Sequence, residues 1–545
     1  MNKKESIWAQ MNTKVLIPGV VIMLVFVVAG ILAPGASYQM LHNSVLWIMD
    51  HFKWFFIMLV ILISLLFAAI CFTKWGDIRL GGKDAKPSLK TSTWFTLSLT
   101  GTIAVGICFY GVSGPVNMLM NPPEFMGVEA GTKEAIIPVL KYCYLHYAFP
   151  PFFIIVAFAL MASLMLYNGK RTMRSSDALY PLLGKKSAGP LGTVIDVVTV
   201  LSLMVCGTNM GLAVIQLNAG IGTVAGMAWT PSFEPFIILG YTLLTIVLAT
   251  SGVHKLMGKL SNFNAACYFV ILLFILLFGA AGGNRLLGTF FTSLGEFVRD
   301  YIPMISFADP IYETGWQTNM TIYYYSWNIV PAFLSGLFYI TLAYGRTLRE
   351  FIVVNCIGPG IVTCLWYVVF GGSAMFSVVN GGDLYDQMQR FGDGIATFAF
   401  LESLPGGAIL KWLFIILAIL TFLTFSDSIA FSFPMLFMKE LETDSSKTKV
   451  PKFMNVAVAL FMGALTFVLL YIGGYDALNE MIVFLGFPLG IVMFLIVLST
   501  VKMLTNREKY DLTYQEELAQ ETAEEKQPPH IAEQKTQQIL EAKIL

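Results

Sequence analysis

The chain has 545 residues, of which 56% are hydrophobic and only 12% are charged, and its formal net charge is zero. Soluble domains carry about a quarter charged residues, so this composition excludes an ordinary soluble protein and indicates one whose surroundings are the lipid bilayer. The zero net charge gives no basic surface for nucleic acid. The seven cysteines are scattered and show no metal-binding spacing. We therefore expect no nucleic-acid partner, no metal and no cofactor.

Apolar runs long enough for an α-helix to cross about 30 Å of hydrocarbon recur along the chain. The polar stretch before the first run does not have the pattern of a cleavable signal peptide, so this run is expected to remain as a span. The sequence thus predicts an all-α membrane protein with twelve transmembrane helices, at about 15–33, 54–73, 94–119, 146–167, 192–219, 233–251, 263–282, 320–344, 351–371, 409–437, 453–473 and 478–502.

Lysine and arginine residues predict the orientation of these spans. The two tails and alternate loops carry 27 of them, against 6 in the other loops, and short loops rich in these residues stay cytoplasmic. Because the number of spans is even, both termini lie on one side. We predict a multi-pass protein of the cytoplasmic membrane with both termini cytoplasmic.

Two long segments on the predicted outer side contain amphipathic patterns. One is 283–319, with RLLGTFFTSLGEFVRDY, and the other is 372–408, with LYDQMQRFGDGIATFAFLESL. Both patterns predict helices that lie along the outer membrane surface. Two interpretations stay open for them, a cap over the bundle and a gate that moves.

The third and eighth spans are unusual for helices that only anchor a protein in lipid. Their glycines and prolines are Gly101, Gly106, Gly111, Gly114 and Pro115 in the third, and Pro331 and Gly336 in the eighth. Glycines either let a neighbouring helix approach closely or let the backbone unwind, which survives at membrane depth only next to protein or a cavity. The two spans lie five apart, as in a pair of five-helix repeats with the first two spans extra.

Several segments resemble motifs of the betaine/carnitine/choline transporter family. The eighth span, in MTIYYYSWNIVPAFLSGLFYITLAYGRTLREF, resembles the family's signature helix. FYGVSGPVNMLMNPP, LHYAFPPF, SGVHKLMGKLSNFN and TFSDS resemble further family motifs in the same order. The resemblance implies a secondary transporter of substrates with a quaternary ammonium group. Against an enzyme, the spans contain no HExxH, no paired cysteine ligands and no Ser/His/Asp set.

The same resemblance implies an architecture. Helices 3–12 would form a five-plus-five inverted repeat of the leucine-transporter type, with two extra N-terminal helices, and the protein would assemble as a homotrimer. Residues 1–90 would then hold the cytoplasmic N-tail and two peripheral helices, and 91–504 the transporter core. Within that core the repeats occupy about 91–282 and 320–504, separated by the segment 283–319, and 505–545 form a polar cytoplasmic tail.

In this family, aromatic side chains of the fourth and eighth helices hold the cation, and the matching positions here are Tyr147, Phe152, Ile155, Trp327 and Asn328. Tyr110 matches the family's binding-site tyrosine, whereas Tyr323 and Tyr324 are candidates because they lie close to Trp327 on one helix. A trimethylammonium group has no N–H to donate, but ring faces within about 6 Å attract its charge. Packing between helices is the alternative role for each ring.

Three of these positions differ from the family pattern, and the differences predict how the substrate is held. Tyr147, Phe152 and Asn328 stand where the family has tryptophan, so the cation should be held less tightly. The Asn328 amide could instead bind a carboxylate or hydroxyl of the substrate. The expected substrate is a small zwitterion or cation, with a non-quaternary amino acid or a sulfonium compound as the alternative.

The sequence leaves two interpretations of how transport is driven. In sodium-driven members the ion lies between the unwound third helix and a Thr-Ser pair on the tenth, and the pair here is Thr424–Phe425. Phenylalanine cannot supply the oxygen that a hard cation requires, so one ligand is missing unless Ser426 substitutes. Sodium-independent antiport, as in the family's carnitine exchangers, is therefore a second interpretation.

Charged residues close the predicted cytoplasmic end of the eighth span. They are Arg346, Arg349 and Glu350. They fit a topology anchor that follows the positive-inside rule, and they equally fit an inner gate made of salt bridges.

Overall fold

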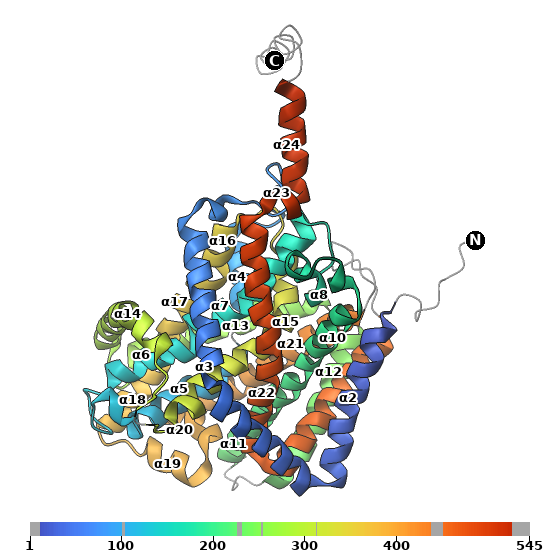
Figure 1. Ribbon diagram of the computed structural model, residues 1–545. Coiled ribbons are helices and arrows are strands. Elements are labelled where there is room, and N and C mark those ends of the chain that lie inside the picture. The colour runs from blue at the N-terminus through green and yellow to red at the C-terminus, as the bar shows by residue number, and fades with distance from the viewer. Residues whose placement is uncertain are drawn as a thin grey trace.

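The protein is helical throughout the part that the computed structural model describes, residues 11–100, 104–225, 231–251, 254–311, 313–437 and 451–525 (Figure 1). Within these ranges the only β-type pairing is an isolated antiparallel bridge between Arg79 and Thr347. The predicted all-α class is therefore confirmed for the described residues. Figure 1 shows most helices side by side in one bundle, with α24 projecting from one end.

The longer helices are α2 (Thr13–Leu32), α3 (Pro34–Phe72), α4 (Thr91–Thr100), α5 (Ala104–Met120), α6 (Ile136–Tyr147), α7 (Phe149–Ser163), α10 (Pro190–Val200), α11 (Met204–Ala225), α12 (Glu234–Ser251), α13 (His254–Phe278), α14 (Gly283–Ser306), α15 (Tyr323–Thr341), α17 (Gly358–Trp366), α21 (Gly407–Ser432), α22 (Lys452–Thr505) and α24 (Leu512–Glu525). The shorter ones are α8 (Ser175–Ala178), α9 (Tyr180–Leu183), α16 (Leu348–Ile352), α18 (Ser373–Val379), α19 (Leu384–Phe391), α20 (Ala396–Glu402) and α23 (Arg507–Tyr510). Turns of π-helix are η3 (Leu164–Asn168), η7 (Thr318–Ile322), η8 (Val353–Ile357) and η9 (Tyr367–Gly372). Turns of 3-10 helix are η1 (Lys74–Asp77), η2 (Glu124–Met126), η4 (Gly184–Ala188), η5 (Leu201–Leu203), η6 (Pro231–Phe233), η10 (Asp393–Ile395) and η11 (Phe433–Phe437).

Seven helical stretches among the described residues are long and apolar enough to cross a membrane. They are Thr13–Leu32, Pro34–Phe72, Ile136–Asn168, Pro190–Ala225, Leu348–Val379, Gly407–Ser426 and Lys452–Thr505, with α13 and α14, bent by 107° at their junction, as an eighth candidate. The helix α22 has 54 residues, about 80 Å at 1.5 Å per residue, more than twice the bilayer core. It changes direction at Gly474, whose backbone is not helical (φ 60°, ψ −134°).

Several helices extend beyond the predicted spans. The second span, predicted at 54–73, is the C-terminal part of α3, which begins at Pro34. The fourth, predicted at 146–167, begins at Ile136 as α6 and continues as α7 after a break at Ala148 (φ −108°, ψ −101°). Apolar runs mark only the part of a helix that faces lipid or core, so the polar turns that continue it escape detection.

The eighth span is a continuous helix. Its glycine, Gly336, allows close packing between helices and does not unwind the backbone. The helix α15 continues through Pro331 without an interruption. A Cβ atom at Gly336 would lie 2.5 Å from the Phe158 ring of α7, so the absence of a side chain lets the two helices touch. For the third span, residues 101–103, between α4 and α5, lie outside the described residues.

The predicted amphipathic segments contain helices. The first holds α14, where Lys141 of α6 pairs with Asp300 at 2.5 Å. The second holds α18, α19, η10 and α20, of which α20 packs on α21 and α5.

Chain segments that are distant in the sequence meet at the end of the bundle from which α24 projects. The Gly345 N–H donates to the Leu80 carbonyl oxygen (2.9 Å), and the Lys83 N–H donates to the Glu517 carboxylate of α24 (2.8 Å). Asp511, which precedes α24, is fully buried. The first turns of the C-terminal segment are thus docked on the bundle.

Candidate functional site

Five of the predicted binding residues lie together where α5, α6 and α15 meet. The centroid of the Trp327 ring is 5.5 Å from that of Tyr110, 6.3 Å from Tyr323 and 6.0 Å from Tyr324. Tyr147 lies 5.9 Å from Tyr110 and 4.7 Å from Tyr324, and its hydroxyl donates to that of Tyr324. The structure therefore brings together rings from three helices that are far apart in sequence.

A missing side chain on α5 makes room for one of these rings. A Cβ atom at Gly114 would lie 2.8 Å from the hydroxyl oxygen of Tyr147, closer than unbonded carbon and oxygen atoms approach. The glycine at position 114 therefore leaves room for the Tyr147 hydroxyl beside α5.

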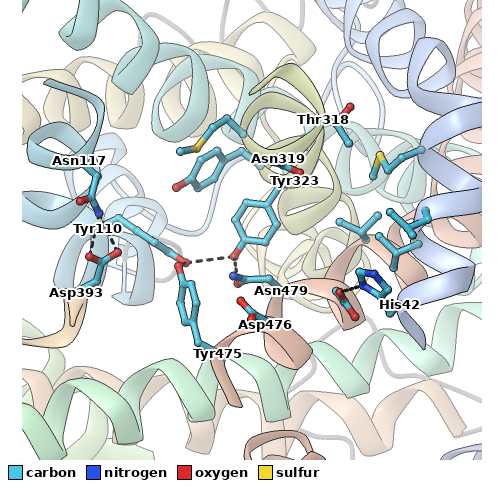
Figure 2. A pocket seen from close by; sticks show the side chains of 18 of the residues that line it. His42, Tyr110, Asn117, Thr318, Asn319, Tyr323, Asp393, Tyr475, Asp476 and Asn479 are labelled. Atoms are coloured by element: carbon cyan, nitrogen blue, oxygen red, sulfur yellow. Dashed lines mark hydrogen bonds and ion pairs between the residues drawn. The ribbon is translucent and has the colours of Figure 1, made fainter. Parts of the chain in front are cut away.

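A cavity of about 540 Å³ lies against this aromatic cluster, large enough for a small organic ligand. We call it the tyrosine cavity. Its lining residues come from seven helices and turns: Tyr38, His42, Val45, Leu46, Met49, Tyr110, Gly114, Asn117, Met118, Tyr147, Thr318, Asn319, Met320, Tyr323, Tyr324, Asp393, Tyr475, Asp476, Asn479, Glu480 and Val483. Figure 2 shows Tyr110, Tyr323 and Tyr475 converging on one another by their hydroxyl groups.

Trp327 does not line the tyrosine cavity. Its side chain is buried, with 8% of the residue's surface exposed, and its indole N–H donates to the Asn209 amide oxygen of α11 (3.0 Å). The rings of Tyr110 and Tyr323 both contact Trp327 and line the cavity. Trp327 therefore lies behind the tyrosines, as seen from the cavity.

Two predicted binding residues are not among the residues that line the cavity. Phe152 is buried in α7, and its carbonyl oxygen accepts a hydrogen bond from the Cys356 thiol. The amide nitrogen of Asn328 donates to the Tyr324 carbonyl oxygen within α15 (2.7 Å). In this conformation the Asn328 amide N–H is therefore used inside its own helix.

The cavity contains carboxylates that the sequence analysis missed. Asp393, Asp476 and Glu480 line it, and no lysine or arginine is found among its described lining residues. The Asn117 amide donates to both carboxylate oxygens of Asp393 at 2.9 Å. Burial raises the pKa of the Asp393 carboxyl, and the hydrogen bond from Asn117 opposes this shift. His42 pairs with Glu480 at 2.5 Å. Two of these carboxylates, Asp476 and Glu480, have a signal in the sequence. They are charged residues between two apolar runs, in GGYDALNE.

The candidate ion-coupling residues occupy α21. The Thr424 hydroxyl donates to the Thr421 carbonyl oxygen of its own helix (2.8 Å), and Ser426 is buried. Thr421 joins α21 to α13: its hydroxyl accepts from the Asn264 amide (2.6 Å) and lies 2.8 Å from the Tyr268 hydroxyl, both on α13. Neutral hydrogen bonds thus connect α21 to α13 here.

The charged residues at the far end of α15 contact the backbone of neighbouring segments. Arg349 donates to the Cys71 and Thr73 carbonyl oxygens and pairs with Asp77 at 2.6 Å. Arg346 lies over the Trp94 ring, 4.6 Å from its centroid. The Glu350 carboxylate accepts from the Thr347 N–H in a capping box at the start of α16. Among these contacts Glu350 serves its own helix, whereas the arginines hold the ends of α3 and α4.

A bundle of apolar helices with an aromatic cluster beside a cavity is consistent with a membrane carrier. The comparison with known proteins identifies the family. The chain belongs to the betaine/carnitine/choline family of transporters, whose family model matches residues 14–509. Proteins of this family are transporters, so the chain is a multi-pass membrane transporter and not an enzyme.

Characterised relatives match over most of their length. A glycine betaine transporter of Acinetobacter baylyi is 26% identical over 509 residues, covering 92% of this chain and 75% of the relative. The high-affinity choline transport protein of Escherichia coli is 26% identical over 490 residues, covering 89% of this chain and 70% of the relative. Glycine betaine transporter 1 of Vibrio parahaemolyticus is 29% identical over 461 residues, with 84% and 86% covered.

Proposed function

We propose that the protein carries small quaternary-ammonium compounds of the betaine, carnitine or choline type across the cytoplasmic membrane by alternating access. The observation that supports this best is the aromatic cluster of Tyr110, Tyr147, Tyr323, Tyr324 and Trp327 against a cavity of about 540 Å³. The relatives named as glycine betaine and choline transporters support the same class of substrate.

The aromatic cluster at Trp327, as distinct from the carboxylates of the cavity, favours a methylated cation over an amine. A primary ammonium would need acceptors for three N–H groups, whereas a trimethylammonium group needs only negative potential and apolar contact, which ring faces supply at about 0.5–2 kcal/mol each. The carboxylates of Asp393, Asp476 and Glu480 in the same cavity give a negative potential that attracts any cation before it reaches the rings. A sulfonium compound has the same chemistry and is included in the test below.

For the architecture we propose twelve spans, with helices 3–12 as a five-plus-five inverted repeat and two extra helices before them. The break of α22 at Gly474 gives two spans from one helix. The Asn12 N–H donates to the Phe437 carbonyl oxygen (2.6 Å), which is expected if the first span begins on the face where the tenth ends. That face, with both termini, is taken as cytoplasmic because the basic loops are there. A homotrimer is the assembly that family membership suggests.

For the driving force we propose sodium-independent exchange. This rests on Phe425, which occupies a position where an oxygen ligand would be needed.

The experiment that tests the function is counterflow in proteoliposomes loaded with unlabelled substrate. The panel contains glycine betaine, carnitine, choline, a sulfonium analogue and an ordinary amino acid, with and without sodium or a proton gradient. We expect accumulation of at least one onium compound that does not require sodium. Uptake of the amino acid alone would contradict the substrate class, and strict dependence on sodium would contradict the exchange mechanism.

A further inference from the structure

The carboxylates that line the tyrosine cavity come from two separate parts of the chain. Asp393 belongs to η10, whereas Asp476 and Glu480 lie one turn apart on α22, after its break. None of the described residues that line the cavity is a lysine or an arginine, and the one histidine, His42, pairs with Glu480. Figure 2 shows the Asp393 and Asp476 side chains near the Tyr475 ring.

The two aspartates are not neutralised by a basic partner. The Asn117 amide that donates to both oxygens of Asp393 at 2.9 Å is uncharged, so it orients the carboxylate and leaves its charge in place. Asp476 is exposed and forms no ion pair with another described residue. Glu480, by contrast, lies 2.5 Å from His42. Asp393 and Asp476 therefore give the cavity two negative charges without a counter-ion.

The aromatic cluster offers a substrate carboxylate few hydrogen-bond donors. The Trp327 indole N–H and the Tyr147 and Tyr323 hydroxyls each carry one hydrogen, and each already donates to a neighbouring protein group. A carboxylate in the cluster would have to break one of these hydrogen bonds or remain unpaired, and an unpaired buried charge is costly. A trimethylammonium group needs no donor.

Both aspartates lie near the aromatic cluster. Tyr110 and Asn117, the partner of Asp393, are both on α5, about 10 Å apart along the helix axis at 1.5 Å per residue. Asp476 directly follows Tyr475, whose hydroxyl lies 3.1 Å from that of Tyr110. One charge about 10 Å away at an effective dielectric constant of about 50 changes the affinity for a monovalent ligand about threefold, so two charges change it about tenfold. A zwitterion has no net charge and gains little from them.

We infer that Asp393 and Asp476 are specificity-determining residues that make a net cation the preferred cargo, an onium alcohol of the choline kind in place of a zwitterion such as glycine betaine. This rests on the proposed function, because it takes the quaternary ammonium group as given and adds the charge of the rest of the molecule. The hydroxyl of such an alcohol can donate to a carboxylate of the cavity, whereas a carboxylate on the substrate is repelled by it.

The test compares three ligands that share a trimethylammonium group, by calorimetric binding to the purified full-length protein. They are choline, glycine betaine and the amide of glycine betaine, which has the shape of the zwitterion without its negative charge. We expect choline and the amide to bind about tenfold more tightly than glycine betaine. Glycine betaine that binds as tightly as its amide would overturn the inference and leave the proposed function standing. Failure of all three to bind would refute the proposed function itself.

Variants of the two aspartates test whether these residues cause the preference. Asp393→Asn and Asp476→Asn should each lower the ratio of the Kd of glycine betaine to that of its amide about threefold. The matched control is Asp386→Asn, on an exposed residue of α19 that does not line the cavity, and it should leave the ratio unchanged. An unchanged ratio in the two cavity variants, or an equal change in the control, would contradict the assignment. Thermal unfolding checks each variant, and the exposed position of Asp476 keeps the test open if Asp393→Asn does not fold.

Discussion

Replacing Trp327 by phenylalanine should weaken binding of a cation more than binding of a neutral molecule of the same shape. The change removes the indole, whose ring lies 5.5 Å from Tyr110 and 6.0 Å from Tyr324, and the hydrogen bond to Asn209. The neighbouring tyrosines and most of the packing remain. Because tryptophan attracts cations best and a desolvated pair contributes about 0.5–2 kcal/mol, we expect a loss of about 1 kcal/mol, or about fivefold in Kd.

The assay is calorimetric binding of two matched ligands to purified protein. Choline carries the trimethylammonium group, and 3,3-dimethylbutan-1-ol replaces its nitrogen with carbon and so has no charge. Trp327→Phe should raise the Kd of choline about fivefold and that of the alcohol less than twofold. Trp412→Phe, at a residue that is 57% exposed on α21, is the control. Equal weakening of both ligands would show that Trp327 only packs, and an unchanged Kd for choline would refute the site.

Three further changes test other parts of the structure. Asp393→Asn removes a cavity charge and should raise the KM of choline about threefold, the effect of one charge about 10 Å away at an effective dielectric constant of about 50. Since burial raises the pKa of Asp393, acid pH should neutralise the wild-type carboxyl and bring its KM towards that of the variant; parallel pH profiles would contradict this. Asp511→Asn loses the Arg507 ion pair (2.7 Å) and should destabilise the docked tail by roughly 2 kcal/mol, measured by thermal unfolding and by proteolysis of the tail; unaltered protection would refute it. Gly114→Ala places a methyl group 2.8 Å from the Tyr147 hydroxyl and should raise the KM without lowering expression; an unchanged KM would show that Tyr147 can shift freely.

Much of the helical framework can be predicted from the sequence because apolar length is a strong signal. The apolar run at 54–73 lies within α3, and the interruption between 473 and 478 coincides with the break of α22 at Gly474. The pattern at 283–319 contains α14. These features depend on local composition, and a single glycine or an amphipathic period is enough to mark them.

The site was only partly accessible to the same reasoning. Tyr110 and Trp327 could be selected by motif, but their contact depends on how α5 packs against α15, which no local pattern encodes. Tyr475 and Asp393 were missed because they lie outside the matched motifs, on segments that reach the cavity only in the folded bundle. The hydrogen bond from the Asn328 amide to the Tyr324 carbonyl oxygen is likewise not indicated by any local pattern. Long-range packing therefore decides which polar groups face the cavity.

The most direct test of the central claim is a structure of the protein with a bound trimethylammonium compound. The account predicts the onium nitrogen within about 6 Å of the Trp327 ring centroid. A ligand bound elsewhere, with the space at Trp327 filled by neighbouring side chains, would contradict it.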